Sequence, residues 1–549
     1  MLLQGLHFRN LRGDLFGGIT AAVVALPLAL AFGVSSGAGA IAGIYGAICV
    51  GFFAALFGGT PSQVSGPTGP MTVVMAAVFT QFSAVDPVNG PAVAFTVVLM
   101  GGFFQILFGA FKLGKYVTLM PFPVISGFMS GIGVIIIALQ LSPLLGFPAE
   151  SSVVSSLQHL PHNLSEFHSG ALILGLLTLV ILFACPATVS RVIPAPLLAL
   201  ILCTVIAMFV FSNQPVPVIG EIPTGLPSLI LPTIEPELLK DMLLSAIMLA
   251  ALGSIDSLLT SLVADNMTKS QHDSDRELIG QGVGNMVAGL FGGLPGAGAT
   301  MRTVVNIRAG GESSLSGAVH ALVLLIVVLG AGGLAENIPH AVLAGILIKV
   351  GIDIIDWDFL RRLHRAPIFV VVLMLLVLGL TVFVDLVTAV LVGVFLANII
   401  TIKRLSDHQV ESIRLISDQP DELDVLTHRE KELLTAATGR ILLYKIDGPV
   451  SYASVKGMTN KLRHWGDYDA LLFDVSTVPL IDVSTAMAFE NMILDALQQN
   501  RQVYFIGMDD AVRHVFDRMD ISKLLPESCF YDSRERAVEI AFQGVFSEE

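Results

Sequence analysis

Charged side chains are scarce in this sequence. Asp, Glu, Lys and Arg make up 13% of its 549 residues, whereas they make up about 25% of a typical soluble domain. Between Phe16 and Phe111 the sequence contains a single formal charge, Asp86. A chain this poor in charge, with a mean hydropathy of +0.78, is not a soluble globular protein. Its composition predicts a chain embedded in a membrane.

Cysteine is also rare, and the four positions that carry it limit the chemistry of the chain. Cys49, Cys185, Cys203 and Cys529 have neither the spacing of a zinc site nor that of a disulfide framework. The apolar region contains no nucleophile–base pair and no metal cluster, so we predict neither an enzyme nor a resident cofactor. No basic patch with interleaved aromatic residues indicates a nucleic-acid partner. The net charge of −14 does not identify a substrate, because many acidic residues lie beyond residue 404.

Long apolar runs are abundant instead. A helix needs roughly 20 apolar residues to cross a bilayer, and about fourteen apolar windows follow one another along the chain. These windows cover residues 14–33, 37–57, 67–82, 93–112, 118–142, 169–186, 192–212, 240–263, 276–294, 299–309, 313–332, 337–354, 366–384 and 385–402. They predict an all-α polytopic membrane domain of about 14 spans, surrounded by membrane lipid.

Basic residues at both ends of the apolar region predict its orientation. Arg9 and Arg12 precede the first window, and Lys403 and Arg404 follow the last one. Lys and Arg are enriched in cytoplasmic segments, and an even number of spans returns the chain to the side on which it started. We therefore expect both termini to be cytoplasmic, in a multi-pass protein of the cell inner (plasma) membrane.

The chemistry of the chain changes after Arg404. Residues 405–439 are charged and predict a linker with a helical pattern. Between residues 440 and 549, β-rich runs such as ILLYKI and QVYFIGM alternate with amphipathic segments such as VKGMTNKLRHW. This alternation predicts a small α/β domain with helices packed on a sheet. The predicted organisation is a transmembrane domain (1–404), a linker (405–439) and a cytoplasmic α/β domain (440–549).

Two segments more than two hundred residues apart repeat a composition that breaks helices. ALFGGTPSQVSGPTGPMTVV spans residues 55–74, and GLFGGLPGAGATMRTVV spans residues 289–305. Each runs into one of two unusually short windows. Paired Gly- and Pro-interrupted segments in corresponding positions of two halves indicate a transporter site between inverted repeats. Alternatively, the glycines serve only close packing between helices.

If the repeat marks a site, it predicts two half-helices that start near Gly69 and Thr300 and face each other at the bilayer midplane. Non-helical backbone at that depth must be buried in protein or line a wet cavity. A helix N-terminus offers free N–H groups and the positive end of the helix dipole. Two such ends can bind an anion without a buried base, and Thr68 and Thr300 can add hydroxyl donors.

Asp256 lies within the apolar segment ALGSIDSLLT. An ionised Asp at the centre of a membrane helix costs about 2.5–3.5 kcal/mol on insertion scales, so a cation, a proton or a partner group must offset that cost. Thr260 lies one turn further along the same helix face. This carboxylate and hydroxyl, with Thr300 and the GAGA backbone, predict a sodium site. Alternatively, Asp256 caps a neighbouring half-helix.

These motifs resemble those of the SulP anion-transporter family, whose animal members include prestin. The resemblance rests on GGITAAVVALPLALAFG, FFAALFGGTPSQVSGPTG, SIDSLLTSLVAD and ATMRTVVNIRAGG. The segment LLFDVSTVPLIDVSTAMAFENMI resembles the centre of a STAS domain. The resemblance covers essentially the whole chain. It implies a seven-plus-seven inverted repeat with core and gate subdomains, a homodimer, and a C-terminal STAS domain.

Within the family, the motifs are most similar to those of the sodium-dependent bicarbonate transporters. The sodium ligands that this resemblance implies are Asp256, Thr260, Gly298, Ala299 and Thr300. The expected anion-binding residues are Phe32, Thr68, Gly69, Ala299, Thr300 and Arg302. Two positions depart from the pattern, because Arg302 replaces a small residue and Leu28 stands where many relatives have Gln.

Arg302 admits three interpretations. It strengthens the positive field at the anion site, pairs with Asp256, or points toward an aqueous cavity; we favour the first. A fixed positive charge attracts anions in general, which weakens the case for bicarbonate alone.

The tail contributes one further candidate residue. Ser484 occupies the position at which bacterial anti-sigma-factor antagonists carry a phosphorylated serine, at the start of a predicted helix, so the resemblance makes it a candidate regulatory site. Alternatively, Ser484 is simply an N-cap residue.

Three functions are compatible with these features. The first is sodium-coupled symport of a small inorganic anion, with bicarbonate as the leading candidate. The second is proton-coupled transport of sulfate or a dicarboxylate, with Asp256 as the proton site. The third is a prestin-like anion channel or exchanger, against which the carboxylate–hydroxyl pair argues because it favours ion coupling.

Overall fold

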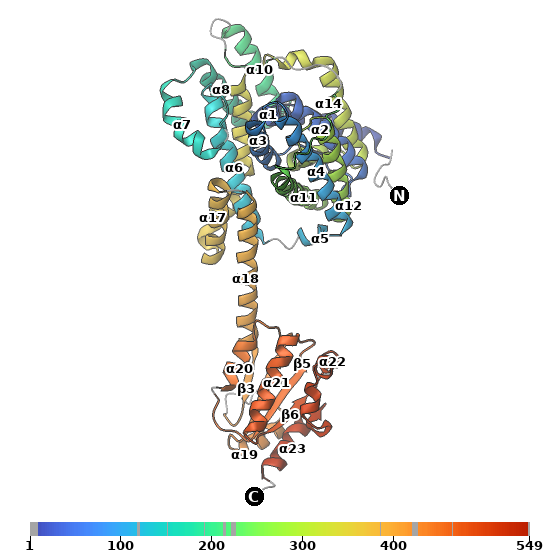
Figure 1. Cartoon of the computed structure of the whole chain (residues 1–549), viewed down its shortest axis with the longest axis vertical. Coiled ribbons are helices and arrows are strands. Elements are labelled where there is room, and N and C mark those ends of the chain that lie inside the picture. The colour runs from blue at the N-terminus through green and yellow to red at the C-terminus, as the bar shows by residue number, and fades with distance from the viewer. Residues whose placement is uncertain are drawn as a thin grey trace. The chain divides into compact units, whose positions relative to one another are not determined.

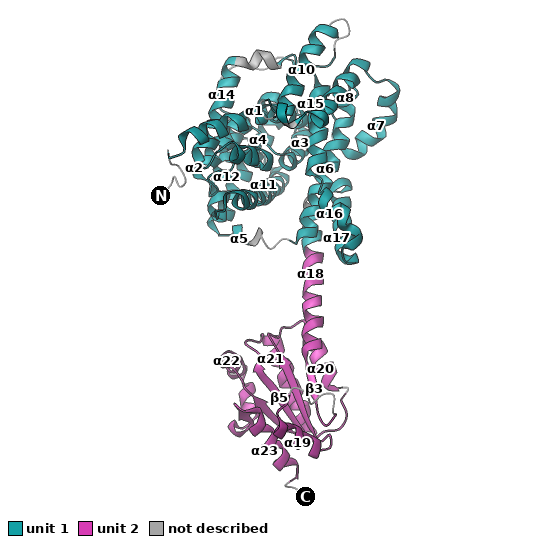
Figure 2. Ribbon diagram, turned by 180° about the vertical axis from the view of Figure 1, so that it is seen from behind, with its two compact units in different colours: residues 1–394 teal, residues 395–549 magenta. Residues whose placement is uncertain are grey.

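The computed structural model of the chain divides into two compact units. It describes residues 9–117, 121–150, 152–190, 193–211, 216–220, 227–384, 386–419, 426–463 and 465–546. Unit 1 comprises residues 1–394 and unit 2 residues 395–549 (Figures 1 and 2). The boundary falls inside one long helix, α18 (Leu386–Ser412).

The described residues of unit 1 form helices, connecting loops and two very short strands. Its elements before the middle of the chain are α1 (Leu11–Ser35), α2 (Ala40–Phe57), β1 (Ser65–Gly66), α3 (Gly69–Val85), α4 (Gly90–Ala110), α5 (Gly114–Val117), α6 (Phe122–Leu144), α7 (Val153–Ser165), α8 (Ser169–Ala184), α9 (Ala187–Ser190) and α10 (Ala195–Val210). The later elements are α11 (Leu239–Thr268), α12 (Ser274–Leu290), β2 (Ala297–Gly298), α13 (Thr300–Arg308), α14 (Ser314–Ala335), α15 (His340–Ile354), α16 (Trp357–Arg362), η1 (Leu363–Arg365), α17 (Ile368–Phe383) and then α18.

Each predicted apolar window overlaps one of these helices. By length and composition, six described helices can cross a membrane, or seven if the bent pair Val153–Ser165 and Ser169–Ala184 counts as one span. Four further apolar helices are shorter: Gly69–Val85, Ala195–Val210, Ser314–Gly330 and Ile368–Phe383. The chain therefore has a mostly helical membrane domain, as the composition predicts.

The helices of unit 1 pack as two groups. The first helix group, which surrounds the two short strands, comprises α1–α4 and α11–α14. The second helix group comprises α6, α7, α8, α10, α15 and α17, and Figure 1 shows α6, α7 and α8 together beside the first group. Helices α1 and α3 of the first group contact α15 and α6 of the second. The interface between the groups therefore lies next to the start of α3.

The two LFGG turns make reciprocal contacts. The first turn follows α2, and the carbonyl of Gly59 accepts a hydrogen bond from the amide of Asp273, which caps α12, at 3.2 Å. The second turn follows α12, and the amide of Leu294 donates to the carbonyl of Ala42 in the first turn of α2 at 2.8 Å. Each turn thus bonds to the start of the helix that precedes the other turn.

Unit 2 is built on one five-stranded sheet. Its strands are β3 (Arg414–Ile416), β4 (Ile441–Asp447), β5 (Ala470–Thr477), β6 (Gln502–Ile506) and β7 (Phe530–Tyr531). Its helices are α19 (His428–Ala436), α20 (Val455–Arg463), α21 (Val483–Gln498), α22 (Asp510–Arg518), α23 (Arg534–Phe546), η3 (Ile521–Leu524) and η4 (Glu527–Cys529). The strands are ordered β3-β4-β5-β6-β7, and only β3 runs antiparallel to its neighbour. Strand β3 and helix α19 lie in the predicted linker.

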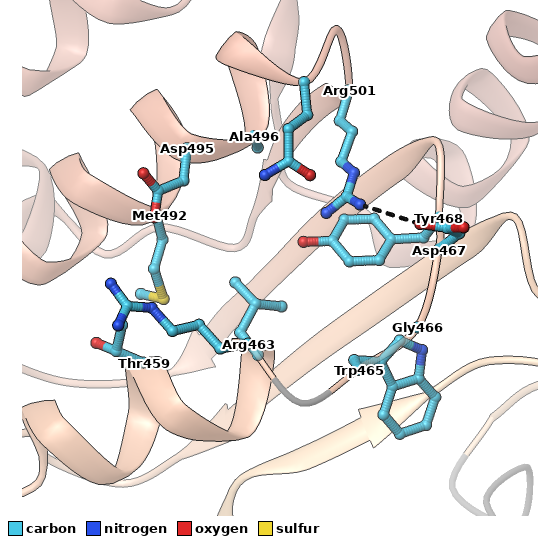
Figure 3. Close-up of a pocket in the computed structure, with 12 residues that line it drawn as sticks. Thr459, Arg463, Trp465, Gly466, Asp467, Tyr468, Met492, Asp495, Ala496 and Arg501 are labelled. Carbon is cyan, nitrogen blue, oxygen red and sulfur yellow. Dashed lines mark ion pairs between the residues drawn. The ribbon is translucent and has the colours of Figure 1, made fainter.

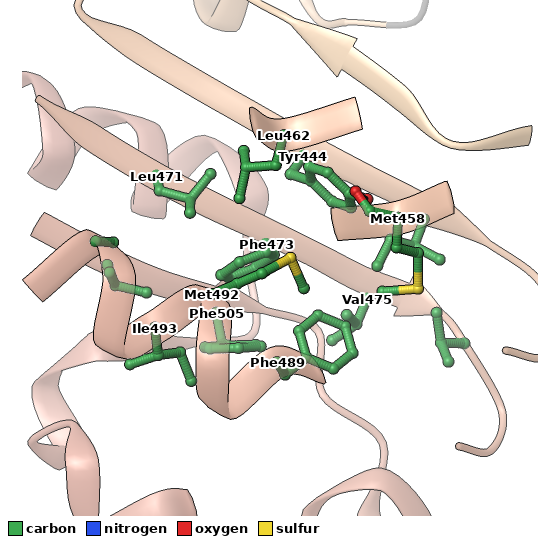
Figure 4. Close-up of a cluster of buried hydrophobic side chains, with 14 of the residues drawn as sticks. Tyr444, Met458, Leu462, Leu471, Phe473, Val475, Phe489, Met492, Ile493 and Phe505 are labelled. Atoms are coloured by element: carbon green, nitrogen blue, oxygen red, sulfur yellow. The ribbon is translucent and has the colours of Figure 1, made fainter. Parts of the chain in front are cut away.

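Alternate residues of each strand face opposite sides of this sheet. Leu442 and Tyr444 of β4 belong to a core beneath α20, α21 and α22, and Figure 4 draws several of its side chains, among them Phe473, Phe489 and Met458. Leu443 belongs to a second core beneath α19 and α23. Helices therefore cover both faces of the sheet, which gives the α/β domain predicted for the tail.

Candidate functional site

Two short strands bring the breaks in the repeat together. Strands β1 and β2 pair antiparallel, with Ser65 opposite Gly298 and Gly66 opposite Ala297. A Cβ atom on Gly296 would lie 2.6–2.9 Å from the backbone of Gly66, so only glycine allows this close approach. The segments 66–70 and 298–302 consequently meet, as the sequence predicts.

A half-helix starts directly after each strand. Helix α3 begins at Gly69 and α13 at Thr300, and neither the Thr68 nor the Ala299 side chain caps the helix that follows it. Pro70 lies in the first turn of α3, where its missing N–H leaves no bond unmade. No N-cap side chain bonds to the first-turn amides of either helix, and the first residues of both helices line the gap between them. Such amides favour an anion.

The gap is a cavity of about 370 Å³. All but one of the predicted anion and sodium residues line it: Phe32, Thr68, Gly69, Asp256, Gly298, Ala299, Thr300 and Arg302. The exception is Thr260. Val24 and Leu28 of α1 contribute apolar walls, and Met129 of α6 and Ile346 of α15 close the side formed by the second helix group. The cavity thus combines apolar walls with a few converging polar groups, which is typical of a small-ligand site.

Oxygen atoms gather on one side of the cavity, behind β2. The hydroxyl of Thr260 donates to the carbonyl of Gly298 at 2.9 Å and lies 2.7 Å from the hydroxyl of Thr300. The Thr260 side chain is fully buried. Ser257 on the same helix accepts from the amide of Gly298 at 3.0 Å, so α11 fixes the position of β2.

Asp256 completes this oxygen cluster. Its side chain is 9% exposed, and its Oδ2 atom is buried without a hydrogen-bond partner. The hydroxyl of Thr68, at the start of α3, borders the same cavity and is likewise buried without a hydrogen-bond partner. A buried carboxylate oxygen without a partner, beside hydroxyl and carbonyl oxygens, provides the hard ligands that a sodium ion takes. The residues that line this side of the cavity therefore have the donor chemistry that a sodium ion takes.

Arg302 lies in the first turn of α13 and is 1% exposed. Its Nη2 atom donates to the carbonyl of Pro67 at 2.8 Å, whereas Nη1 is buried without a partner. A Cβ atom on Gly66, whose φ is +154°, would lie 2.5 Å from Nη1. The described residues include no ion pair between Arg302 and Asp256, so the pairing interpretation is wrong. Arg302 instead joins α13 to the strand that leads into α3.

Gly69 stands where the two helix groups meet. The sequence suggests that a side chain there would crowd the ligand. A Cβ atom at this position would lie 2.8 Å from the side chain of Ile136 and 2.9 Å from that of Ile354. The first obstacle to a larger residue is therefore the second helix group, because these residues belong to α6 and α15.

A buried polar network behind the strands was missed from the sequence. The Glu277 carboxylate accepts from the amides of Gly59 and Thr60, both at 2.9 Å, and from the side chains of Gln63 and Gln281, both at 2.8 Å. The sequence does contain a signal for this network, namely that Glu277 lies inside the predicted window 276–294. A carboxylate within a membrane helix needs partners. This network holds the first LFGG turn against α12.

Ser484 does not cap the helix in which it lies. Helix α21 is capped by Asp482, whose carboxylate accepts from the amide of Thr485 at 2.8 Å. Ser484 is exposed in the first turn of that helix, so the N-cap interpretation of Ser484 is wrong. Burial raises the pKa of Asp482, but hydrogen bonds from Thr485 and Tyr452 outweigh burial and lower it below the ordinary value.

Unit 2 also contains a cavity of about 350 Å³, which is drawn in Figure 3. Residues 465–468, which precede β5, line it, whereas Ser484 follows β5 in the chain. The guanidinium of Arg501 stacks 3.8 Å from the centre of the Tyr468 ring. Two arginines and two aspartates line this cavity, and none of the predicted site residues does. Its charges cancel, so the lining favours no class of ligand. The cavity in unit 1 is the stronger candidate site.

The fold and the cavity together define a class of protein. Interrupted apolar helices whose two half-helix N-termini converge on one cavity are an architecture found in secondary transporters. Residues 11–377 match the model of the sulfate permease family, and residues 432–537 match that of the STAS domain. The chain therefore belongs to the sulfate permease family and carries a C-terminal STAS domain.

Individual relatives agree with this assignment. The bicarbonate transporter BicA of Picosynechococcus sp. is 51% identical over 546 residues, which cover 98% of this chain and 96% of that protein. The solved transmembrane domain of a cyanobacterial BicA is 55% identical, with a TM-score of 0.67, and covers 71% of this chain and 100% of that one. The murine Solute Carrier 26 family member A9 anion transporter shares the fold, with a TM-score of 0.82, 19% identity, and 98% and 94% of the two chains covered.

Proposed function

We propose that this protein transports bicarbonate across a membrane by symport with sodium. The observation that carries the proposal is the convergence of two half-helix N-termini without side-chain caps on one cavity. The wall of this cavity also holds Asp256, whose Oδ2 atom is buried without a partner. The half-helix ends supply positive potential for an anion, and the oxygen cluster supplies ligands for a cation. The 51% identity to BicA supports bicarbonate as the anion. No residue is assigned a catalytic role, since the relatives are named as transporters.

In this proposal the anion contacts the starts of both half-helices. Thr68 and Gly69 offer one end and Ala299 and Thr300 the other, while Phe32 provides an apolar wall. Sodium is held by Asp256 and Thr260 with Gly298, Ala299 and Thr300. The two ions support each other, because the cation neutralises the carboxylate that would otherwise repel the anion.

We also propose the finer architecture that the family implies. The reciprocal LFGG contacts support an inverted repeat, with seven spans in each half and 14 in all. The first and second helix groups correspond to core and gate subdomains, so alternating access moves one group against the other. A homodimer in the plasma membrane with both termini cytoplasmic completes the proposal, with Ser484 as an exposed regulatory position.

Proton-coupled transport of sulfate or a dicarboxylate is the second candidate. The specific observation in its favour is again the buried Asp256 Oδ2 atom without a partner, because a protonated carboxyl group tolerates burial better than a carboxylate does. In that case Asp256 binds a proton where the first proposal places sodium.

Uptake into proteoliposomes separates the two candidates. We expect radiolabelled bicarbonate to enter when an inward sodium gradient is imposed at equal pH on both sides, and sulfate and succinate to enter far more slowly. Uptake that ignores sodium but follows an imposed pH gradient would contradict sodium symport and support the second candidate.

A further inference from the structure

One face of α15 lines the same cavity from the second helix group. Ile346, Lys349, Val350, Asp353 and Ile354 all border it. Their spacing of three, four, seven and eight residues from Ile346 places them along a single stripe of the helix. The stripe lies opposite the half-helix ends, and it contains two charged residues that the proposed anion and sodium sites do not use.

These two charges neutralise each other. The ammonium group of Lys349 donates to both carboxylate oxygens of Asp353, at 2.5 and 2.6 Å. The side chain of Lys349 is 23% exposed and that of Asp353 is 43% exposed. The ammonium group also lies 5.2 Å from the centre of the Phe183 ring on α8. Lys349 is therefore held at the cavity wall by a partner on its own helix and an aromatic ring on another.

Lys349 differs from the other base at this cavity. Arg302 is 1% exposed and bonded to the Pro67 carbonyl, so it acts on an anion mainly through its field. Lys349 has accessible surface and three N–H donors on a flexible stem. It also belongs to the second helix group, whereas both half-helices belong to the first.

A carboxylate next to this lysine serves a transporter better than a free lysine would. An unpaired ammonium group in a partly dry cavity holds an anion strongly, whereas conduction and release require binding that is weak enough to reverse. Asp353 supplies the competing anion. A substrate oxyanion can replace one Asp353 oxygen on arrival, and Asp353 can reclaim the ammonium group when the substrate leaves.

We infer that Lys349 is a second contact for the transported oxyanion, provided by the second helix group, and that Asp353 is the internal competitor that limits the strength of this contact. The inference rests on the proposed anion site. It makes the substrate a bridge between the half-helix amides of one group and an ammonium group of the other. Anion occupancy thereby depends on how the two groups approach each other.

The two residues predict opposite effects on anion binding. Lys349→Gln removes the contact and leaves Asp353 to repel the anion, so we expect the bicarbonate half-saturation concentration to rise about tenfold, the loss of one charged hydrogen bond. Asp353→Asn frees the lysine, so the half-saturation concentration should fall by a factor of about three to ten, with slower turnover because release is slower.

The double variant Lys349→Gln/Asp353→Asn distinguishes the loss of the Lys349 contact from the repulsion that an unpaired Asp353 would exert on the anion. It carries no unpaired charge on α15, and we expect it to bind bicarbonate more weakly than Asp353→Asn alone. It also keeps the test valid if Lys349→Gln does not fold. Lys523→Gln is the matched control, because it breaks an exposed Lys523–Asp520 pair in unit 2. It should change neither the bicarbonate half-saturation concentration nor the turnover.

Two measurements are required on the full-length protein. The first is sodium-driven bicarbonate uptake into proteoliposomes at fixed pH. The second is the bicarbonate concentration that produces half of the maximal rise in melting temperature, in detergent at fixed sodium. This concentration reports binding without transport. Measured at saturating bicarbonate, so that the coupling between the two ions does not enter, the sodium half-saturation concentration should stay within about twofold of wild type in each variant, because Lys349 donates and binds no cation.

A purely structural ion pair gives a different result. If Lys349→Gln and Asp353→Asn weaken bicarbonate protection equally, or if neither shifts it, the inference about Lys349 is overturned. A wild-type protein that neither transports bicarbonate nor gains thermal stability from it would instead overturn the proposed function itself.

Discussion

Replacing Thr260 by valine removes one hydroxyl from the centre of the proposed sodium site and keeps the shape of the side chain. That hydroxyl bonds the Gly298 carbonyl at 2.9 Å and lies 2.7 Å from the Thr300 hydroxyl. It is fully buried, so water does not replace it. The substitution therefore subtracts one oxygen ligand from a site that includes Asp256.

The expected loss is that of one contact between a charge and a hydroxyl oxygen, and we take its energy to equal that of a hydrogen bond to a charged group. Such a contact contributes about 1.5–3 kcal/mol, which corresponds to roughly a 10- to 100-fold change in a dissociation constant. We expect Thr260→Val to raise the sodium half-saturation concentration of bicarbonate uptake by about this factor. Uptake should recover at high sodium, because the carboxylate of Asp256 remains.

Thr381→Val is the matched control for this experiment. Thr381 is 2% exposed in α17, and its hydroxyl donates to the Val377 carbonyl of its own helix at 2.7 Å. The control also loses a buried threonine hydroxyl, but at a position that does not line the cavity. Equal sodium half-saturation in the two variants, measured by uptake and by sodium-dependent melting temperature, would refute the assignment of Thr260 to the sodium site.

Further predictions concern the anion site, the coupling carboxylate and the tail. Asp256→Asn should abolish sodium stimulation while the protein stays folded; uptake that still rises with external sodium would contradict this. Arg302→Met should weaken sulfate inhibition more than bicarbonate affinity, since the charge product doubles for a divalent anion; equal losses would mean that Arg302 only holds the architecture. Burial raises the pKa of Glu430, but bonds from Arg534 and Thr427 outweigh burial and lower it below its ordinary value. This ion pair therefore stabilises unit 2 above the ordinary carboxyl pKa, and the stabilisation is lost as pH falls through the lowered value. With Glu430→Gln, the melting temperature of unit 2 should fall less steeply as the pH is lowered. Glu527→Gln breaks an exposed pair and should leave this pH dependence unchanged.

Much of the helical framework could be predicted from composition, and the exceptions have physical reasons. Helix α7, with the sequence VVSSLQHLPHNLS, lies between two predicted windows because its polar residues and Pro161 lower its hydropathy. Strand β3 falls within the predicted linker, because its three residues are too few to show a period and the strand is defined by its pairing with β4. The finer count of 14 spans stays a prediction.

The candidate site was predictable where glycine and proline interrupt apolar runs. Those breaks predicted the starts of α3 at Gly69 and α13 at Thr300, since lipid does not tolerate unpaired backbone. Lys349 and Asp353 were missed because averaging over the window 337–354 hides a charge pair four residues apart. Their place at the cavity depends on which face of α15 packs inward, and only the tertiary structure determines that face.

Coupling of sodium to bicarbonate at one site is the central claim, and reversing the driving force tests it most directly. Proteoliposomes containing the full-length protein are given an inward bicarbonate gradient at equal pH, with the membrane potential clamped, and radiolabelled sodium is followed. The account predicts that sodium accumulates against its own gradient in wild type and not in Asp256→Asn. Bicarbonate entry without any sodium accumulation would contradict it.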